Sequence, residues 1–504
     1  MDKNNTEKAE NESGKQNPLS TKIKENIQLL KDTFKDCGTL VTRDIENQID
    51  SSVSFCIVYS DGMVDNKLMN QDIIRPLLHF RFNRKSGDLV DIIAKQVTLS
   101  DSVERTSDME KIEQAIIYGD CVLLIDGYAE VLLLNTKGWN VRSIAEPEDE
   151  RVLRGPREGF TEAIMVNLSM LRRKLRTPDL KMEYQTFGTR SKTKACICYL
   201  GGLVNQDVLT ELKKRLKKFS IDGTLDVNYI SEMIRDAPAS PVKTIGSTER
   251  PDVVAAKLLE GRVALFLDGT PVVLTMPMFF VENFQSDDDY YLSYYFASIG
   301  RILRFIAFFI STSLPAIYVA LVTFHQEMLP TPLLVSISMA RQGVPFPTVV
   351  EAVLMMAVFE VLRESGSRMP SMMGQALSIV GSLVMGQAAV EARIVSAPII
   401  IIAAASGISG LMISKLKGPI ILLRFIFLMS AGVLGLYGYM FAVLAMLIHL
   451  YNLNSFGIPL MSDATAAGFQ DNKDLYIRAP WWYMKKRPKY LTDNKTRLTT
   501  KDDS

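Results

Sequence analysis

The chain has 504 residues, which is too long for one hydrophobic core and predicts two to four structural units. Its 57 Lys and Arg residues against 56 Asp and Glu leave a net charge of +1, so no overall basic field favours nucleic acid as a partner. Five cysteines and three histidines offer little for a metal centre or a disulfide framework, and no cofactor is expected.

The chain begins with a polar segment. Residues 1–50 are expected to form a disordered or helical tail, because Met1–Thr21 is charged, polar and of low complexity. This segment lacks the apolar stretch of a secretory signal peptide, so residues 1–300 should stay in the cytosol.

The N-terminal half contains an internal repeat. Phe55–Val64 resembles Ala195–Val204, and Gly119–Leu133 resembles Gly261–Thr275 at nearly the same offset. The second block of each copy reads as an apolar run, Asp-Gly and another apolar run, which is the pattern of a β-hairpin. The sequence therefore predicts two α/β subdomains with a connecting helix region between them, at residues 51–145, 191–285 and 146–190.

The repeat contains two aspartates at its turns. Asp126 and Asp268 invite a catalytic interpretation, but a turn aspartate that hydrogen-bonds its own backbone explains them better. Cys196 and Cys198 lie in an apolar run typical of a strand, and their side chains are expected on opposite faces of the sheet.

The connecting region opens with a short basic motif, which precedes a helix that starts at Phe160. The motif is Arg154, Gly155, Pro156, Arg157, Glu158 and Gly159. Free backbone N–H groups at a helix start could cradle an anion. A turn whose arginines pair with Glu146–Glu150 is the favoured alternative.

The composition changes after Arg304. Four apolar stretches of 20–24 residues without an ionisable side chain follow, and each is long enough to cross a bilayer core. They are Phe305–Phe324, Met369–Val390, Ile394–Ser414 and Phe425–Ile448. The sequence thus predicts an α/β cytosolic domain made of two similar subdomains, followed at residues 286–452 by an α-helical polytopic membrane domain of four to six helical segments.

The last segment, residues 453–504, is a basic tail. Lys485 and Lys486 follow Trp481–Tyr483, and basic residues favour the cytosolic side, so the number of crossings should be even. Four crossings, however, would place Lys415 and Lys417 outside, so one or two broken crossings are expected between the first two stretches.

Charged residues in the membrane half are the pore or gating candidates. Glu360, Arg363 and Glu364 fall near one face of a predicted helix, which we expect to lie at the membrane interface rather than to line a gate. Glu391 and Arg393 separate two apolar runs, and a surface loop explains them better than a buried pair.

The last apolar stretch carries two further expectations. Arg424 precedes it and is expected to anchor the helix at the membrane interface. Gly432, Gly435 and Gly438 recur every third residue, a spacing that favours close packing of this helix against a neighbour.

Several motifs, taken in order, resemble one protein family. They are RGPREGFTE (Arg154–Glu162), TERPD (Thr248–Asp252), GRVALFLDGTP (Gly261–Pro271), DDYY (Asp288–Tyr291), LPAIYVAL (Leu314–Leu321), FEVLRE (Phe359–Glu364) and GQAAVEA (Gly386–Ala392). Over roughly residues 50–490 the chain resembles the A subunit of the GerA family of spore germination receptors.

The resemblance implies a non-enzymatic, multi-pass protein of the spore inner membrane, in contact with lipids and with its N-terminal domain in the cytosol. It implies two partners, a transporter-like B subunit that binds the nutrient and a lipoprotein C subunit. The A subunit would couple nutrient sensing to ion release, as a homo-oligomer with a central ion path. Arg154–Gly159, Asp268 and Gly269 are expected to be structural within the family motifs.

Two other functions stay open at this point. One is an A-like accessory protein of the dipicolinate-release system, and the other is a membrane scaffold that docks partner subunits. An enzyme is the least supported class, because the sequence contains no nucleophile–base pair, phosphate loop or metal cluster.

Overall fold

The structure is a computed structural model. It describes residues 19–50, 53–82, 88–100, 102–138, 146–147, 150, 152, 154–368, 385–462, 474–488, 490–492 and 496–497. The chain forms two compact units. Unit 1 comprises Met1–Arg235, Ile245–Pro277 and Arg487–Thr496, and unit 2 comprises Asp236–Thr244, Met278–Lys486 and Arg497–Ser504.

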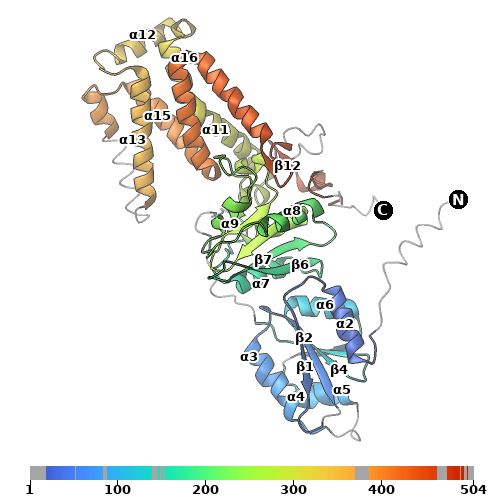
Figure 1. The fold of residues 1–504 in the computed structure, drawn as a ribbon. Coiled ribbons are helices and arrows are strands. Elements are labelled where there is room, and N and C mark those ends of the chain that lie inside the picture. The colour runs from blue at the N-terminus through green and yellow to red at the C-terminus, as the bar shows by residue number, and fades with distance from the viewer. Residues whose placement is uncertain are drawn as a thin grey trace, which may run out of the picture. The chain divides into compact units, whose positions relative to one another are not determined.

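Unit 1 contains two five-stranded antiparallel sheets (Figure 1). The first has the order β1 (Leu40–Glu46), β2 (Ser54–Ser60), β4 (Cys121–Ile125), β5 (Val131–Leu134), β3 (Val103–Thr106). The second has the order β6 (Leu180–Phe187), β7 (Thr193–Leu200), β9 (Val263–Leu267), β10 (Val273–Met276), β8 (Gly246–Thr248). Since the two orders correspond strand for strand, the predicted duplication is present in the fold.

Helices cover these sheets. They are α2 (Ile23–Thr33), α3 (Asn66–Leu68), α4 (Arg75–His79), α5 (Leu89–Ile92), α6 (Met109–Tyr118), α7 (Ile164–Lys174), α8 (Gln206–Leu216), α9 (Val227–Ile234) and α10 (Pro251–Leu259). In the first sheet Phe55 and Ile57 pack into one core cluster, and Cys56 and Val58 pack into another on the opposite face. This strand is therefore buried on both sides, which explains its continuous apolar run.

The repeated lobes begin earlier than the sequence predicts. β1 lies in the expected tail, and α7 and β6 lie in the expected connecting region, yet the two strands belong to the sheets. α2 and α7 are equivalent helices, because Asn26 accepts from the Ser20 N–H and Asn167 from the Thr161 N–H, both at 2.7 Å. Residues 146–190 therefore include the first helix and strand of the second lobe.

Cys196 and Cys198 share one face of β7, with their sulfur atoms 3.8 Å apart. The expectation of opposite faces is wrong, because residues two positions apart in a strand point to the same side. Both thiols are buried, and burial raises the pKa of Cys198.

The two turn aspartates cap helices. Oδ1 of Asp126 accepts from the Ile23 N–H at 3.2 Å, and Oδ1 of Asp268 accepts from the Ile164 N–H at 3.0 Å. These N–H groups open α2 and α7, whose own N-cap side chains provide no hydrogen bond. The expected bond from each aspartate to its own turn is thus replaced by a bond to a distant helix. Gly269, which follows Asp268 in the turn, has a positive φ of 90°.

We expect Asp268→Ala to lower the free energy of unfolding of unit 1 by about 1 kcal/mol, because the first turn of α7 loses its acceptor. Asp126→Ala should do the same for α2. Chemical denaturation of the full chain, followed by its circular dichroism through the unfolding transition of unit 1, measures both effects. The control is Glu46→Ala, an exposed carboxylate on β1. An Asp268→Ala variant as stable as this control would contradict the capping role.

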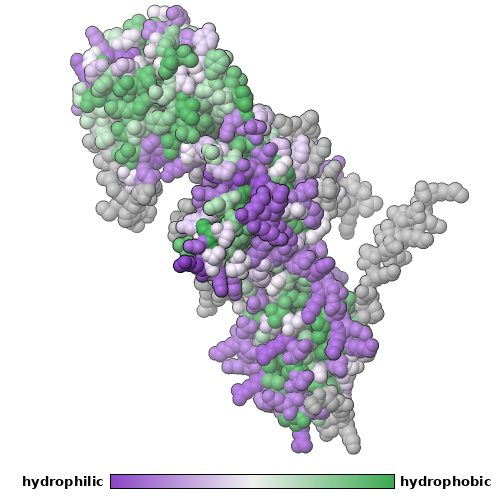
Figure 2. All heavy atoms as spheres, viewed as in Figure 1, coloured by the Kyte–Doolittle hydropathy of each residue, from purple (hydrophilic) through white to green (hydrophobic). Residues whose placement is uncertain are grey.

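Unit 2 is helical, and its surface in Figure 2 is rich in apolar side chains. Its helices are α11 (Tyr294–Thr323), α12 (Thr331–Ala340), α13 (Thr348–Arg368), α15 (Ala397–Leu411) and α16 (Lys417–Asn452). Among the described residues, Tyr294–Thr323 and Ser414–Asn452 are long and apolar enough to cross a bilayer. The expected crossing Phe305–Phe324 falls on α11 and Ile394–Ser414 contains α15, whereas residues 369–384 of Met369–Val390 lie outside the described residues.

Helix α16 folds back on itself at Gly435 (Figure 1). This residue has φ 61° and ψ −143°, a conformation that only glycine adopts readily. The ring centroids of Phe427 and Tyr439 lie 5.6 Å apart, and Met446 packs on the cluster that contains Phe427. A straight helix would separate Phe427 from Met446 by about 28 Å. The expected single crossing Phe425–Ile448 is therefore wrong, because this stretch is a hairpin of two antiparallel arms.

The arms of α16 run between two ends of unit 2. At the Phe284 end, Phe284 clusters with Ala307 of α11 and with Ile420 of the first arm. At the Phe324 end, the α16 turn contacts Phe324, where α11 finishes. Leu450 brings the second arm back to Phe280 at the Phe284 end.

Helices α13 and α15 run opposite to α11. Ile399 of α15 clusters with Val322 near the Phe324 end, and Ile413, just after α15, clusters with Phe284. α13 starts beside α15, because Glu351 accepts from the N–H of Ser396 at 2.9 Å. Unit 2 is thus a bundle in which α13, α15 and the second arm of α16 run opposite to α11 and to the first arm of α16.

Candidate functional site

The centre of unit 2 holds a buried arginine. Arg424 is fully buried, and its guanidinium donates to the carbonyl and hydroxyl oxygens of Ser311 at 2.9 and 2.8 Å. It also donates to the Ser406 carbonyl at 3.3 Å and to Oε1 of Glu360 at 2.8 Å. The expected interfacial position is therefore wrong, because this side chain joins α11, α13, α15 and the first arm of α16.

Glu360 is held by two cations. Arg424 engages Oε1, and Arg363, one turn further along α13, pairs with Oε2 as the i,i+3 spacing predicts. With both oxygens occupied, Glu360 has no free oxygen for a passing cation in this arrangement. The cluster of Ser311, Glu360, Arg363, Ser406 and Arg424, here the central cluster, can hold four helices together or exchange its pairings.

A second buried carboxylate lies toward the Phe324 end. Glu351 is fully buried, and its Oε2 accepts from the backbone N–H and the hydroxyl of Ser396 at 2.9 and 2.8 Å. The Nε atom of Arg341 lies 3.5 Å from its Oε1. Glu351 is not among the site residues predicted from the sequence, although an acidic group in an apolar run is the signal that would have found it.

The other pore or gating candidates lie at the surface. Glu364, Glu391 and Arg393 are exposed, and Arg393 approaches Gly343 at the loop after α12. The structure therefore brings Glu360 and Arg363 into the central cluster and leaves these three outside it.

A third charged cluster precedes the apolar part of α11. Arg301 donates to Asp289 at 2.9 Å and to Asp474 at 2.7 Å, and Arg304 donates to Asp289 at 2.6 Å. Burial by itself raises the pKa of Asp289, but the hydrogen bonds from Arg304 and Arg301 outweigh it and hold that pKa below its ordinary value. This pairing fastens residue 474, distant in sequence, to the start of α11.

Because the folded-state pKa of Asp289 is lowered, its pairing stabilises unit 2 above the ordinary carboxyl pKa, and that stability disappears as the pH falls through the lowered value. We expect Asp289→Asn to cost about 1–3 kcal/mol at pH 7. The thermal midpoints of the variant and the unchanged protein should converge only as the pH falls below the lowered pKa of Asp289, where both side chains are neutral. Midpoints in detergent between pH 2 and pH 8 check this, and a constant difference at every pH would contradict it.

The basic motif of unit 1 follows the favoured turn interpretation in part. Arg157 lies 3.7 Å from Glu146, and Glu158 pairs with Arg173 and Lys174 of α7 at 3.4 and 3.2 Å. Arg154 is exposed, Gly155 has a φ of 125°, and Gly159 is buried.

The sequence analysis missed Arg250, which organises this motif. Arg250 is fully buried and donates to the Pro156 carbonyl at 2.9 Å and to Asp252 at 2.7 Å. Arg250 directly precedes Pro251 and α10, so its bond fixes Pro156 against the second lobe.

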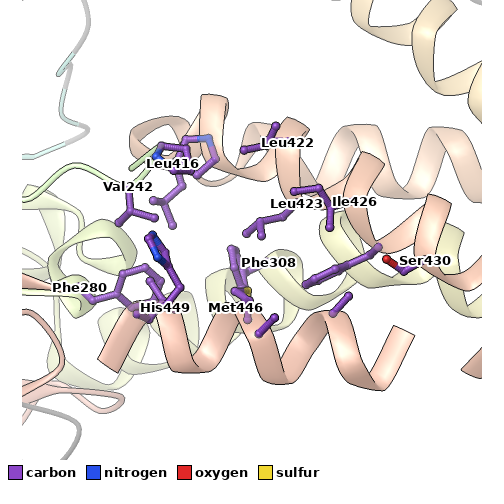
Figure 3. A pocket seen from close by; sticks show the side chains of 16 residues that line it. Val242, Phe280, Phe308, Leu416, Leu422, Leu423, Ile426, Ser430, Met446 and His449 are labelled. Atoms are coloured by element: carbon purple, nitrogen blue, oxygen red, sulfur yellow. The ribbon is translucent and has the colours of Figure 1, made fainter. Parts of the chain in front are cut away.

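An apolar cavity of about 430 Å³ lies between the arms of α16 (Figure 3). Phe308 of α11, Leu423 and Met446 face it, and polar side chains are few. One is His449, whose Nε2 lies 2.9 Å from the hydroxyl of Ser240. Such a lining favours a hydrocarbon group over a charged nutrient, because a buried charge would have no partner there.

In the parts of the chain that the structure describes, no group of three His, Cys, Asp or Glu side chains could hold a metal ion. In the central cluster, charged side chains form ion pairs with one another and hydrogen bonds with serine oxygens.

Comparison with known proteins gives the following similarities. The family model described as Bacillus/Clostridium GerA spore germination protein matches residues 28–490. The chain is 42% identical over 481 residues to the membrane protein YfkQ of Bacillus subtilis (strain 168), covering 95% of this chain and 93% of that protein. It is 40% identical over 476 residues to spore germination protein KA of the same organism, covering 94% and 87%. A crystal structure of the N-terminal domain of the A subunit of the Bacillus megaterium spore germinant receptor GerK3 aligns with a TM-score of 0.41 and 32% identity, over 52% of this chain and 98% of that chain.

Proposed function

Because the chain belongs to the GerA family of spore germination proteins, we propose that it is the A subunit of a nutrient germinant receptor of bacterial endospores, where it couples nutrient sensing to ion release. The observation that carries the proposal is the family match over residues 28–490, nearly the whole chain. Relatives of similar length carry names of spore germination proteins.

The receptor lies in the spore inner membrane, with unit 2 in the bilayer and unit 1 in the cytosol. Support comes from the long apolar helices of unit 2 and from YfkQ, a relative named as a membrane protein. The Phe284 end of unit 2 faces the cytosol, because the exposed Lys415 and Lys417 precede the first arm of α16 at this end.

Unit 2 crosses the membrane six times. α11, α13, α15 and the two arms of α16 supply five passages. Because α13 and α15 run in the same direction, the chain must cross once more between them, and the apolar stretch Met369–Val390, mostly outside the described residues, supplies this sixth passage. Four crossings before α16 place Lys415 and Lys417 on the cytosolic side, and the hairpin at Gly435 returns the basic C-terminal tail to that same side, which removes the conflict of a four-crossing arrangement.

Coupling to ion release runs through the central cluster. Ionisable groups deep in an apolar bundle are expensive to bury, so their presence favours a functional element. Glu360 bonds two arginines on two helices, and a shift of α13 against α16 would exchange these bonds. Such a pair is suited to couple helix movement to the opening of an ion path.

The partners of this chain are a transporter-like B subunit, which binds the nutrient, and a lipoprotein C subunit. Further copies of the chain associate through unit 2 around a central ion path.

Two alternatives keep the family and change the role. As an A-like accessory protein of the dipicolinate-release system, the chain would act after the receptors. As a scaffold, it would only hold partner subunits through unit 1, and the central cluster would be a structural tie. Because Glu360 is saturated by arginines, the scaffold has a specific observation in its favour.

The deciding experiment measures potassium release from spores that lack this chain, one nutrient at a time. We expect at least one nutrient response to disappear. A Glu360→Gln strain should release potassium more slowly at an unchanged protein level, because the variant loses the charge that holds Arg424. The matched control is Glu364→Gln, an exposed carboxylate on the same helix, which should behave as the unchanged strain.

The outcomes separate the roles. If every nutrient still triggers potassium release while dipicolinate release slows, the accessory role is correct and the receptor role is wrong. If Glu360→Gln spores respond normally, yet deletion removes the B and C subunits from the membrane, the scaffold is correct.

A further inference from the structure

One surface of unit 2 is covered by exposed aromatic side chains. Tyr295 and Phe296 of α11 are 68% and 61% exposed, and Trp481, Trp482 and Tyr483 in the C-terminal segment are 46%, 62% and 56% exposed. We call these five residues the aromatic surface. Large aromatic groups facing water in such number mark a surface that contacts something else.

The two parts of the aromatic surface meet through Tyr290 and Tyr294. The ring centroid of Tyr294 lies 3.9 Å from Tyr295 and 6.0 Å from Trp482, and that of Tyr290 lies 6.1 Å from Trp481. Segments almost 190 residues apart in sequence thus form one continuous patch.

Hydrogen bonds and an ion pair hold this patch in place. Arg301 of α11 donates to the side chain of Asp474 at 2.7 Å, and Tyr290 donates to the same carboxylate at 2.7 Å. The N–H of Arg478 donates to the hydroxyl of Ser298 at 3.2 Å, and the guanidinium of Arg478 lies over the ring of Trp481. The C-terminal segment is therefore fixed to the start of α11, not loosely attached to it.

Lysines gather at the same end of unit 2. Lys485 and Lys486 are exposed and are separated from Trp482 by only Tyr483 and Met484. Lys415 is also exposed, and its Nζ donates to the carbonyl of Gln285, whose side chain in turn donates to the carbonyl of Asp474, both next to the fixed segment. Exposed aromatic rings flanked by lysines match a membrane interface, where the rings lie at headgroup level and the cations face anionic lipid.

We propose that the aromatic surface and its lysines bind the headgroup layer of an anionic bilayer. This proposal rests on the membrane location of unit 2 given above. The C-terminal segment then lies at the lipid surface instead of in the bulk cytosol. The start of α11 lies at headgroup level, which sets how deeply unit 2 is inserted in the membrane. A protein partner would also cover aromatic groups, but the lysines favour a negatively charged lipid surface.

The test uses tryptophan fluorescence, because the chain has three tryptophans and two of them belong to the aromatic surface. The third, Trp139, lies outside the described residues and is removed by Trp139→Phe. The full-length variant is reconstituted into vesicles of phosphatidylcholine with or without phosphatidylglycerol. Quenching by lipids brominated near the headgroup is compared with quenching by aqueous iodide.

We expect a blue-shifted emission, quenching by the brominated lipid and protection from iodide, all greater with phosphatidylglycerol. In the double variant Lys485→Gln with Lys486→Gln, the increase in lipid quenching and in iodide protection caused by phosphatidylglycerol should disappear. The control is Lys217→Gln with Lys218→Gln, an adjacent exposed pair in unit 1, which should keep this dependence on phosphatidylglycerol. If Trp139→Phe fails to fold, the fluorescence of the two surface tryptophans is obtained by subtracting the spectrum of the double variant Trp481→Phe with Trp482→Phe from that of the native chain.

Three results would overturn the proposal. Quenching by iodide but not by lipid means that the tryptophans face water, and protection from both quenchers means that protein covers them. If lipid quenching is the same with and without phosphatidylglycerol, and unchanged in the lysine variant, the surface does not recognise anionic lipid. A chain that does not enter vesicles at all would refute the membrane location itself, and this outcome is distinct because the readout does not depend on germination.

Discussion

Arg424→Gln lowers the stability of unit 2 by about 3–5 kcal/mol, because a buried charge loses its partner. Arg424 is fully buried, and its removal leaves the carbonyls of Ser311 and Ser406 without their donor. It also leaves Glu360 with Arg363 alone. The measurement is the thermal unfolding of the purified chain in detergent. Arg393→Gln, an exposed arginine in the same unit, is the control and should change little.

A double-mutant cycle identifies the bond responsible. Glu360→Gln and Arg424→Gln, alone and combined, should show a coupling energy of about 1–3 kcal/mol, since the two side chains are in direct contact at 2.8 Å. Strictly additive effects on the unfolding free energy would mean that Arg424 stabilises unit 2 through the serine carbonyls and that its bond to Glu360 contributes nothing. In that case the coupling role of the Glu360–Arg424 pair would be withdrawn.

Gly435→Ala should disrupt the hairpin of α16. The backbone conformation of Gly435 costs any other residue about 1–3 kcal/mol, and a Cβ atom would lie 2.9 Å from the Cβ of Phe324 and from Nε2 of His325. We expect a total loss above about 3 kcal/mol, because strain and overlap add. Thermal unfolding in detergent measures it. The matched control is Gly418→Ala on the same helix, where a Cβ meets nothing within 4 Å.

The hairpin also has a topological readout. Cysteines introduced at Lys417 and Tyr451, the outer ends of the two arms, should react with a membrane-impermeant reagent from the same side of the membrane. A continuous helix of 36 residues would put them on opposite sides. Labelling from opposite sides would therefore refute both the hairpin and the six-crossing arrangement.

Much of unit 1 could be predicted from the sequence. The repeat, the Asp-Gly turns and the apolar strands are local patterns, and the two sheets carry them in the same strand order. The lobe boundaries differed because α2 and α7 show their equivalence only through the bonds of Asn26 and Asn167, which the blocks of similar sequence do not include. The capping role of Asp268 was missed because its helix starts more than 100 residues earlier.

In unit 2, spacing along one helix predicted the Glu360–Arg363 pair correctly. The same kind of reasoning failed for Arg424, because a charge beside an apolar stretch has the same sequence pattern whether it ends at the interface or inside the bundle. The glycine spacing of α16 predicted close packing correctly but did not reveal the reversal, since a glycine every third residue suits both. Gly432 does pack against Val349, while Gly435 turns the chain.

The sequence by itself determined the division into an α/β half and an apolar helical half, the internal repeat and the family. These features depend on residue patterns within short windows and on the order of motifs, which folding does not change. Only the tertiary structure decided which charges are buried and with whom they pair. Arg424 meets Glu360 across 64 residues and Arg301 meets Asp474 across 173, and contacts at such separations follow from the packing of whole helices rather than from any local pattern.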